Sequence, residues 1–223
     1  MLELLTYIFF GFIWYQFIAI FGISIGLHRS LCHKQVELSK AYEVFALFLV
    51  TLTGARSPLG WIGAHRIHHA TADTVDDPHS PDIKGFWKVL FNRWTCKSIP
   101  RKYIKDELKN SRIMFFHHYW KHIHLSVALI ALLIGIDVFL IFIAVPFILG
   151  FLGYGFFNAA GHKDFRPRTN KWINILSAGE GYHDIHHKNP KQVRLNKYDL
   201  AGFVLETLNK RSFFYESKLL QKK

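Results

Sequence analysis

The chain carries histidines at spacings that could hold metal ions. Two segments, HRIHHATADTVDDPHSP and GEGYHDIHH, share an HxxHH pattern. On an α-helix, residues at i, i+3 and i+4 lie on one face, and a face made of imidazoles is typical of binding to iron, zinc or copper. The histidines of the two patterns are His65, His68, His69, His183, His186 and His187. A single HxxHH could be a histidine-rich surface helix, but its repetition favours a metal centre.

Two further segments add to this set. GLHRSLCH contains His28 and His33, and FNAAGH contains Asn158 and His162. Asn158 and His162 stand at i, i+4 and therefore on one helix face, although Asn158 could instead bond a neighbouring helix. His28 and His33 would point roughly 140° apart on a continuous α-helix, so we expect the helix to end or bend between them. Nine of the 14 histidines fall in these segments, and because one transition metal takes about four to six ligands, they predict two metals.

Other polar residues receive different interpretations. Five carboxylates near the HxxHH segments are candidates for holding imidazole tautomers, with solvated loop charge as the alternative: Asp73, Asp76, Asp77, Glu180 and Asp184. Four histidines lack the HxxHH register and lie among aromatics, which favours anchoring at a membrane interface: His117, His118, His122 and His124. We expect His79 to be structural, and Cys32 and Cys96, which form no CxxC, to be free thiols.

The elements that must position these residues belong to a membrane class, because 50% of the residues are hydrophobic and 16% are aromatic. Residues 2–27 are apolar for the roughly 20 residues of a bilayer span, with no basic leader or cleavage signature, and indicate a retained helix. Residues 41–53 are too short to cross and are expected either to lie in the membrane interface or to pack under the histidine segments. Residues 125–160 are long enough for two short spans with a turn near Gly135 and Asp137.

The sequence therefore predicts an all-α integral membrane protein, a single domain over residues 1–223. About three transmembrane helices, at residues 2–27, 124–138 and 140–160, would leave the N-terminus outside and place the histidine-rich segments 28–123 and 161–223 in the cytosol. The net charge of +12 could suggest nucleic acid. In a chain with long apolar runs it is better explained by the positive-inside rule and by anionic lipid headgroups, so no nucleic acid is expected.

The ordered set HRSLCH, HRIHHATADTVDDPHSP, NAAGH and GEGYHDIHH resembles the membrane fatty acid desaturases of the delta-9, stearoyl-type class. The resemblance runs from about Gly26 to Leu205. It implies an oxidoreductase of lipid metabolism that inserts a cis double bond into a saturated acyl chain, using O2 and two electrons at a di-iron centre. It also implies an acyl-lipid or acyl-CoA substrate and a donor such as cytochrome b5 or ferredoxin. The implied ligands are His28, His33, His65, His68, His69, His162, His183, His186 and His187, with Asn158 acting through a water molecule.

Two features depart from the family pattern. Members usually have two spans before the first histidine segment, whereas only one fits here. The lead-in WIGAHRIHH lacks the Arg and Asp typical of animal acyl-CoA enzymes and is more similar to the bacterial and plant enzymes, so an acyl-CoA substrate is not assumed. Zinc binds imidazole sites well and could displace iron in a purified sample.

An acyl tail must be kept dry and precisely placed, so we expect an apolar tunnel between the first and last spans, just beneath the histidine segments. Phe12, Tyr15 and Gln16 lie roughly 18–24 Å before His28 on the first helix and are candidates for the tunnel floor. Two alternatives stay open at this stage. A related membrane di-iron hydroxylase would share the histidine pattern but insert oxygen. A metal transporter would need more polar residues in its spans than Gln16 and Asp137.

Overall fold

The structure is a computed structural model that describes residues 2–54, 56–93, 96 and 98–208. The last part of the predicted cytosolic segment 161–223, residues 209–223, lies outside the described residues. The described part of the chain is helical and contains no strand, only two isolated β-bridges, which join His162 to Pro167 and Thr169 to Tyr182. The all-α class expected from the sequence is therefore confirmed.

The first helix differs from expectation in its geometry. Helix α1 (Leu2–Phe17) runs without a break into a π-helix, η1 (Ile18–Cys32). In a π-helix the backbone bonds run between residues five apart, and the His33 N–H donates to the His28 carbonyl at 3.0 Å. The helix therefore continues past His28 and ends at Cys32, with His33 as its C-cap, so the end expected between His28 and His33 is present without a bend. The π geometry brings residues at i and i+5 to the same side.

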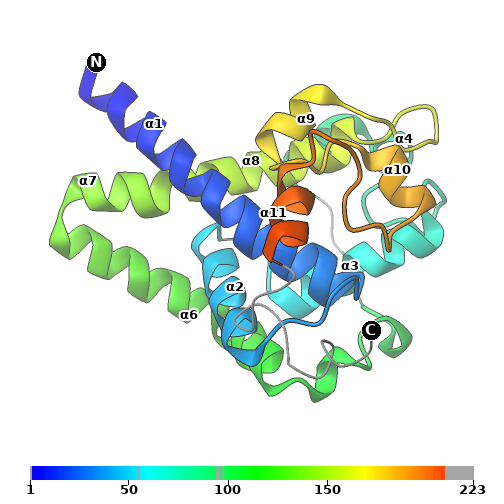
Figure 1. The fold of residues 1–223 in the computed structure, drawn as a ribbon, viewed down its shortest axis with the longest axis horizontal. Coiled ribbons are helices and arrows are strands. Elements are labelled where there is room, and N and C mark those ends of the chain that lie inside the picture. The colour runs from blue at the N-terminus through cyan, green and yellow to red at the C-terminus, as the bar shows by residue number, and fades with distance from the viewer. Residues whose placement is uncertain (1, 55, 94–95, 97, 209–223) are drawn as a thin grey trace.

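Helix α2 (Lys40–Leu52) packs along η1, as Figure 1 shows. The Ser39 side chain caps it by accepting the Tyr42 N–H. Gly26 lets the two helices approach closely, since a Cβ at that position would collide with the Ala46 Cβ. Most side chains of α2 are buried, which agrees with a short helix packed beneath the histidine segments.

A helical hairpin follows the middle of the chain. Helix α6 (Ser111–Ile134) begins at Asn110, whose side chain accepts the N–H groups of Arg112 and Ile113. It turns at Gly135 into a continuous helix made of α7 (Ile136–Phe139), η4 (Leu140–Ala144) and α8 (Val145–Ala160). Within the described residues, two helices are long and apolar enough to cross a membrane, Leu2–Cys32 and Ile136–Ala160.

The remaining helices gather around the histidine segments. They are α3 (Pro58–Thr71), α4 (Pro81–Lys84), α5 (Phe86–Leu90), η2 (Arg101–Tyr103), η3 (Glu107–Lys109), α9 (Lys171–Leu176), α10 (His183–Lys188) and α11 (Leu200–Leu208). In Figure 1, α1 and the hairpin of α6 and α7 project to one side, and α3, α9 and α10 lie on the other. The projecting helices expose large apolar side chains, for example Phe9 at 59% and Leu133 at 77%. The packed end is held by a buried apolar cluster that joins η1, α2, α3 and α6.

Candidate metal centre

The nine histidines singled out in the sequence lie in two groups of converging ring nitrogens. The five-histidine group consists of His28, His33, His65, His69 and His186, and the four-histidine group consists of His68, His162, His183 and His187. Each HxxHH pattern is divided between the two groups. Helices α3 and α10 therefore each contribute to both groups, a division that the spacing alone did not indicate.

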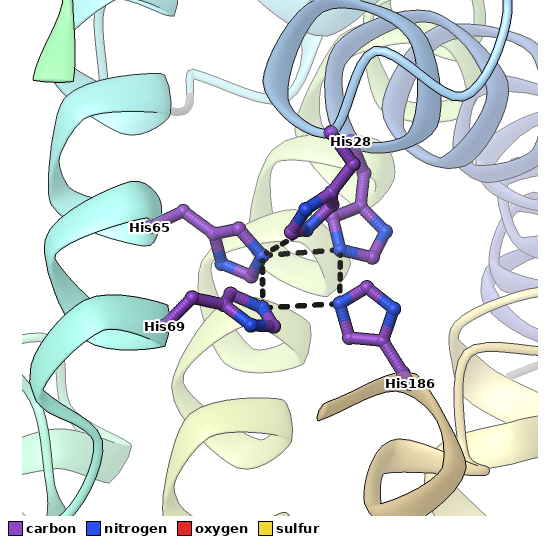
Figure 2. A group of neighbouring side chains, drawn as sticks. His28, His65, His69 and His186 are labelled. Atoms are coloured by element: carbon purple, nitrogen blue, oxygen red, sulfur yellow. Dashed lines mark hydrogen bonds between the residues drawn. The ribbon is translucent and has the colours of Figure 1, made fainter. Parts of the chain in front are cut away.

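The five-histidine group is built by η1, α3 and α10, and Figure 2 shows its imidazoles pointing toward one another. The Nε2 atom of His65 lies 3.1 Å from Nε2 of His28, 3.0 Å from that of His33 and 3.1 Å from that of His69. The Nε2 atom of His186 lies 3.1 Å from that of His28 and 3.0 Å from that of His69. All five ligand atoms lie within 4.8 Å of one another.

The four-histidine group repeats this arrangement beside it. The Nε2 atom of His183 lies 3.0 Å from the Nε2 atoms of His162 and His187, and His187 Nε2 lies 3.2 Å from that of His68. His162 follows Gly161, the C-cap of α8, so the chain leaving that helix supplies a ligand that neither α3 nor α10 provides. Three separate stretches of chain thus meet at each group.

These contacts cannot be satisfied as ordinary hydrogen bonds. A neutral imidazole has one N–H, so His65 Nε2 can donate to at most one of the three nitrogens around it. Where Nδ1 carries the proton, every Nε2 presents a lone pair to the others. Converging lone pairs are stabilised by a cation between them, which is the donor set that a metal needs.

The spacing also indicates which metal geometry fits. Ligand nitrogens about 2.1 Å from a metal and at right angles to each other are separated by about 3.0 Å, whereas tetrahedral angles give about 3.4 Å. The observed separations of 3.0 to 3.2 Å match the right-angled arrangement. Five imidazoles also exceed the four ligands typical of structural zinc. The residues present therefore fit transition metal ions bound by nitrogen ligands near right angles.

Three of the five candidate carboxylates contact imidazoles at Nδ1. Asp77 Oδ2 lies 2.8 Å from His68 Nδ1, and Asp73 Oδ2 lies 2.7 Å from His162 Nδ1. Glu180 Oε2 lies 3.2 Å from His28 Nδ1. A carboxylate that accepts a hydrogen bond from Nδ1–H leaves the Nε2 lone pair free to bind a metal. These three side chains therefore favour the tautomer with the proton on Nδ1.

The other two carboxylates are placed differently. Asp184 accepts a hydrogen bond from the Thr169 hydroxyl, and Asp76 is exposed. His79 is buried against His68, with ring centroids 4.3 Å apart, and its backbone N–H donates to Asp77. Together with His68 and Asp77 it forms a third group of side chains that could hold a metal ion, so its expected structural role stays a prediction.

Burial lowers the pKa of seven of the nine histidines, which favours their neutral form. It lowers the pKa of His65, His68, His183 and His186 well below 6.5, and it lowers the pKa of His33 and His187 to about 2. Burial would raise the pKa of Glu180, but the positive charge of Arg29 and the contact with His28 outweigh it and lower that pKa. The site thus combines neutral imidazoles with an ionised carboxylate, the protonation states that metal binding requires.

An apolar cavity opens onto the five-histidine group at His28 and His65. The cavity walls are Tyr15, Ala19, Ile23, Ser24, His28, Trp61, His65, Gly153, Tyr154, Phe156, Phe157, Ile173, Leu176, Ser177 and Glu180. Trp61 stacks on His65 with ring centroids 4.8 Å apart.

Of the three residues expected at the tunnel floor, Tyr15 lines this cavity. The Gln16 side chain instead donates to the Ile175 carbonyl at 3.3 Å, and Phe12 is partly exposed outside the lining.

Sequence reasoning missed four aromatic residues of the cavity wall, Trp61, Tyr154, Phe156 and Phe157. The first two carry a spacing signal. Trp61 stands four residues before His65, and Tyr154 stands four residues before Asn158. Residues four apart share a helix face. This spacing from a candidate ligand is a signal that could have found both.

A second, more polar cavity shares Trp61 and Tyr154 with the first. It is lined by Thr53, Gly54, Arg56, Trp61, Asn92, Trp120, Phe151, Tyr154 and Asn158. Asn158, the expected water-mediated ligand, therefore borders this cavity about one helical turn before His162. The two cavities meet where the aromatic rings of Trp61 and Tyr154 stand.

The histidines expected to serve as interface anchors lie on α6 outside both groups. His117 Nδ1 is 2.9 Å from the Ser57 hydroxyl, and His124 Nδ1 is 2.9 Å from the Thr51 carbonyl. Cys32 and Cys96 are free thiols, as expected. None of these residues belongs to either histidine group.

A helical protein with two apolar helices, and with two histidine groups that could each hold a metal ion, has the features of a membrane metalloprotein. The comparison with protein families makes the class specific. Residues 4–207 match the model of the fatty acid desaturase family, so the chain belongs to that family.

Named relatives support this assignment. The chain is 34% identical over 188 residues to an acyl-CoA C20 Delta5-desaturase of Anemone leveillei, covering 78% of the chain and 60% of that protein. It is 28% identical over 221 residues to an sn-1 stearoyl-lipid 9-desaturase of Anabaena variabilis, covering 91% and 80%. It is 31% identical over 183 residues to an sn-1 stearoyl-lipid 9-desaturase of Synechocystis, covering 74% of the chain and 56% of that protein.

Proposed function

We propose that the chain is a fatty acid desaturase that inserts a cis double bond, at the delta-9 position, into a saturated acyl chain. The observation that carries the proposal is the apolar cavity, which ends against His28 and His65 of the five-histidine group. A cavity with apolar walls and a metal-type donor set at one end suits a long alkyl substrate. The family and the names of its relatives point to the same chemistry.

The proposed cofactor is a pair of iron ions, one in each histidine group. The proposed ligands are the nine histidines, with Asn158 acting through a water molecule. When bound, the two irons would activate O2, which takes two hydrogens from adjacent methylenes together with two electrons and two protons, giving one double bond and two waters. Neutral imidazoles at right angles suit iron in this reaction.

The residues of this chain position and shield the substrate. Trp61 and Phe157 form apolar walls next to the histidines and exclude water from the reacting methylenes. Tyr15 lies at the part of the cavity formed by α1 and α8, where it would meet the methyl end of the tail. The distance from Tyr15 to the histidines would then set which carbon pair is oxidised.

The acyl carrier is proposed to be a membrane lipid, with acyl-CoA as the other candidate. Relatives of both kinds are named, stearoyl-lipid and acyl-CoA desaturases. The polar cavity beside Trp61 contains Arg56, Asn92 and Asn158 and would take the polar end of the substrate. The electron donor is proposed to be cytochrome b5, ferredoxin or a similar carrier.

The proposed topology has three membrane helices in one domain, with the N-terminus outside and the histidine groups in the cytosol. Helices Leu2–Cys32 and Ile136–Ala160 supply two crossings. The second half of α6 supports a third, since Leu125, Leu129 and Leu133 are exposed. The short turn at Gly135 returns the chain to the side that carries His28 and His162.

The function is tested by product analysis. A desaturase-deficient host would express the chain, and total fatty acids would be measured by gas chromatography–mass spectrometry, with disulfide adducts to locate the double bond. The inactive variant is His68→Ala, and the matched control is His122→Ala, an exposed histidine outside both groups. We expect a new monounsaturated acid in the wild type and in His122→Ala that is absent from His68→Ala.

Other products would decide against the proposal. A hydroxylated acid, heavier by one oxygen, would assign the chain to the related hydroxylases. If no product forms when cytochrome b5 and ferredoxin are each co-expressed and the protein is iron-loaded, the desaturase proposal fails.

A further inference from the structure

Arg29 is a buried cation beside the five-histidine group. It follows His28 in the π-helix η1, and only 1% of its surface is exposed. A guanidinium at such a position is strongly destabilising unless it is fully paired. Its partners therefore show what the surrounding structure is built to hold.

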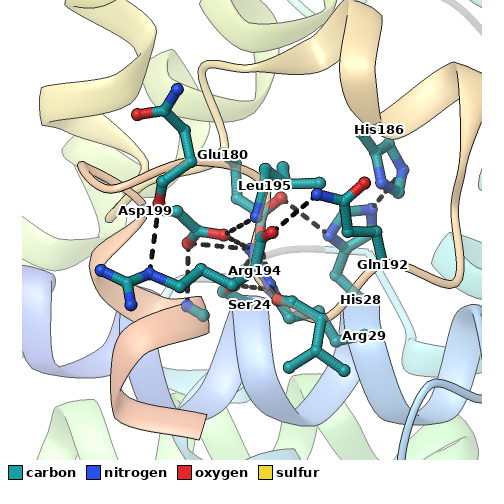
Figure 3. A network of polar contacts seen from close by, with 12 residues as sticks. Ser24, His28, Arg29, Glu180, His186, Gln192, Arg194, Leu195 and Asp199 are labelled. Atoms are coloured by element: carbon teal, nitrogen blue, oxygen red, sulfur yellow. Dashed lines mark hydrogen bonds and ion pairs between the residues drawn. The ribbon is translucent and has the colours of Figure 1, made fainter. Parts of the chain in front are cut away.

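Arg29 is paired with two carboxylates, as Figure 3 shows. Its Nε donates to Glu180 Oε1 at 3.0 Å and to the Ser24 hydroxyl at 3.1 Å. Its Nη2 donates to both oxygens of Asp199, at 3.0 and 2.9 Å, and its Nη1 donates to the Val193 carbonyl. Every nitrogen of the guanidinium is thus in use.

Glu180 divides its two oxygens between Arg29 and the histidines. Oε1 accepts from Arg29 and from the Ser24 hydroxyl, while Oε2 faces His28 Nδ1 at 3.2 Å. When His28 Nδ1–H donates a hydrogen bond to Oε2, His28 Nε2 presents its lone pair toward Nε2 of His65 and His186, each 3.1 Å away. The guanidinium therefore orients the carboxylate, and the carboxylate orients the imidazole.

The four-histidine group is held differently. Asp77 accepts the backbone N–H groups of Asp73 and His79, and Asp73 accepts the Ser80 hydroxyl. Among the contacts described for these two carboxylates, neither involves an arginine. The buried guanidinium thus acts on one of the two groups.

Arg29 also connects the metal-type site to the segment that follows α10. Asp199 accepts the N–H groups of Leu195 and Gly202 as well as the guanidinium, so it fixes the start of α11. Lys191 of the same segment donates to the His33 carbonyl. The residues after α10 are thereby held across the end of η1.

We propose that Arg29 is a positioning residue for the metal of the five-histidine group, acting through Glu180 to hold His28 with Nε2 free for binding. The proposal rests on the proposed metal centre. It predicts a loss of affinity for one of the two metals only. A general effect on folding would instead change the affinity for both. Residues that orient metal ligands typically change metal affinity by about 10–100-fold when they are replaced.

The test is anaerobic titration of metal-free, full-length protein in detergent with ⁵⁷Fe(II), using a competing chelator for affinity and Mössbauer spectra to distinguish the two irons. His33→Ala identifies the signal of the five-histidine group. We expect Arg29→Gln to lower the affinity of that iron by about 10–100-fold and to change its spectrum, while the other iron keeps its affinity within about 2-fold. Arg194→Gln is the matched control, because Arg194 pairs with Glu206 and is partly exposed.

A double-mutant cycle tests the route through Glu180. If Arg29 acts through Glu180, adding Arg29→Gln to Glu180→Gln should cause little further loss of iron affinity. Equal loss at both irons, or full additivity of the two changes, would overturn the proposal. If Arg29→Gln does not fold, Arg29→Lys replaces it, and wild-type affinity and spectra in that variant would overturn it too. Failure of the wild type to bind two irons would instead overturn the proposed centre itself.

Discussion

Replacing Gly153 by alanine should shorten the acyl chains that the protein accepts. Gly153 and Tyr15 both line the apolar cavity. A Cβ at Gly153 would lie 2.7 Å from the Tyr15 hydroxyl oxygen, and ordinary contacts begin at 3.4 Å, so the hydroxyl must move by about 0.7 Å, the difference between the two. Tyr15 is 5% exposed and packed against its neighbours, so the open space for this movement is the cavity.

The size of the effect follows from the cost of misfitting one methylene in an apolar pocket, about 1–3 kcal/mol or roughly 10–200-fold in kcat/KM. We expect the longest accepted acyl chain to lose at least about 10-fold in kcat/KM relative to a chain two carbons shorter. Tyr15→Phe removes the hydroxyl and leaves the ring carbon Cζ at 3.8 Å, an ordinary contact. The double variant should therefore recover the wild-type preference.

The assay gives expressing cells an equal mixture of saturated acids and measures the ratio of their products by gas chromatography–mass spectrometry. Gly150→Ala is the matched control. Gly150 lies on the same helix as Gly153 but does not line the apolar cavity. A Cβ at Gly150 would lie 2.7 Å from the Thr53 Cβ, an equally close contact. An unchanged product ratio in Gly153→Ala, or a similar change in Gly150→Ala, would refute the reasoning.

Three further predictions concern stability and metal binding. Gly26→Val should lower the free energy of unfolding by about 1–3 kcal/mol, because the side chain would collide with Ala46 where α2 packs on η1; an unchanged thermal midpoint in detergent would contradict the packing. Asp77→Asn should lower the affinity for one iron by about 10–100-fold, because the buried Asp77 holds His68. The matched change Asp76→Asn, at an exposed residue, should leave the affinity for both irons unchanged. Equal losses of affinity in the two variants would contradict the assignment. Burial lowers the pKa of buried histidines such as His65 well below 6.5, so below pH 6.5 the unfolded chain binds more protons than the folded chain. The free energy of unfolding of the metal-free protein should then decrease by up to about 1.4 kcal/mol per pH unit for each such histidine. A thermal midpoint that stays constant as the pH is lowered from 6.5 to 5 would contradict their burial.

Much of the site could be predicted from the sequence because its signals are local. The HxxHH patterns lie on helices α3 and α10, and the turn lies at Gly135, the glycine that was expected to form it. Helical periodicity and glycine chemistry act over a few residues, so these features depend little on distant contacts. The long apolar runs likewise indicated the two helices able to cross a membrane.

Other features depend on tertiary structure and could not be predicted from the pattern. Nothing in IAIFGISIGLHRSLC distinguishes π from α geometry, yet the π-helix is what brings His28 and His33 together. The division of each HxxHH between two groups requires three segments to meet in space. Arg29 was overlooked because its partners Glu180 and Asp199 lie more than 150 positions away.

The most direct test of the two-metal centre is the iron content of purified protein from iron-rich, zinc-poor medium, measured by mass spectrometry against protein concentration. We expect two irons per chain in the wild type. We expect one iron per chain in His33→Ala, which alters the five-histidine group, and one in His162→Ala, which alters the four-histidine group. A folded wild type with one iron, or variants that both keep two, would contradict the two-metal centre.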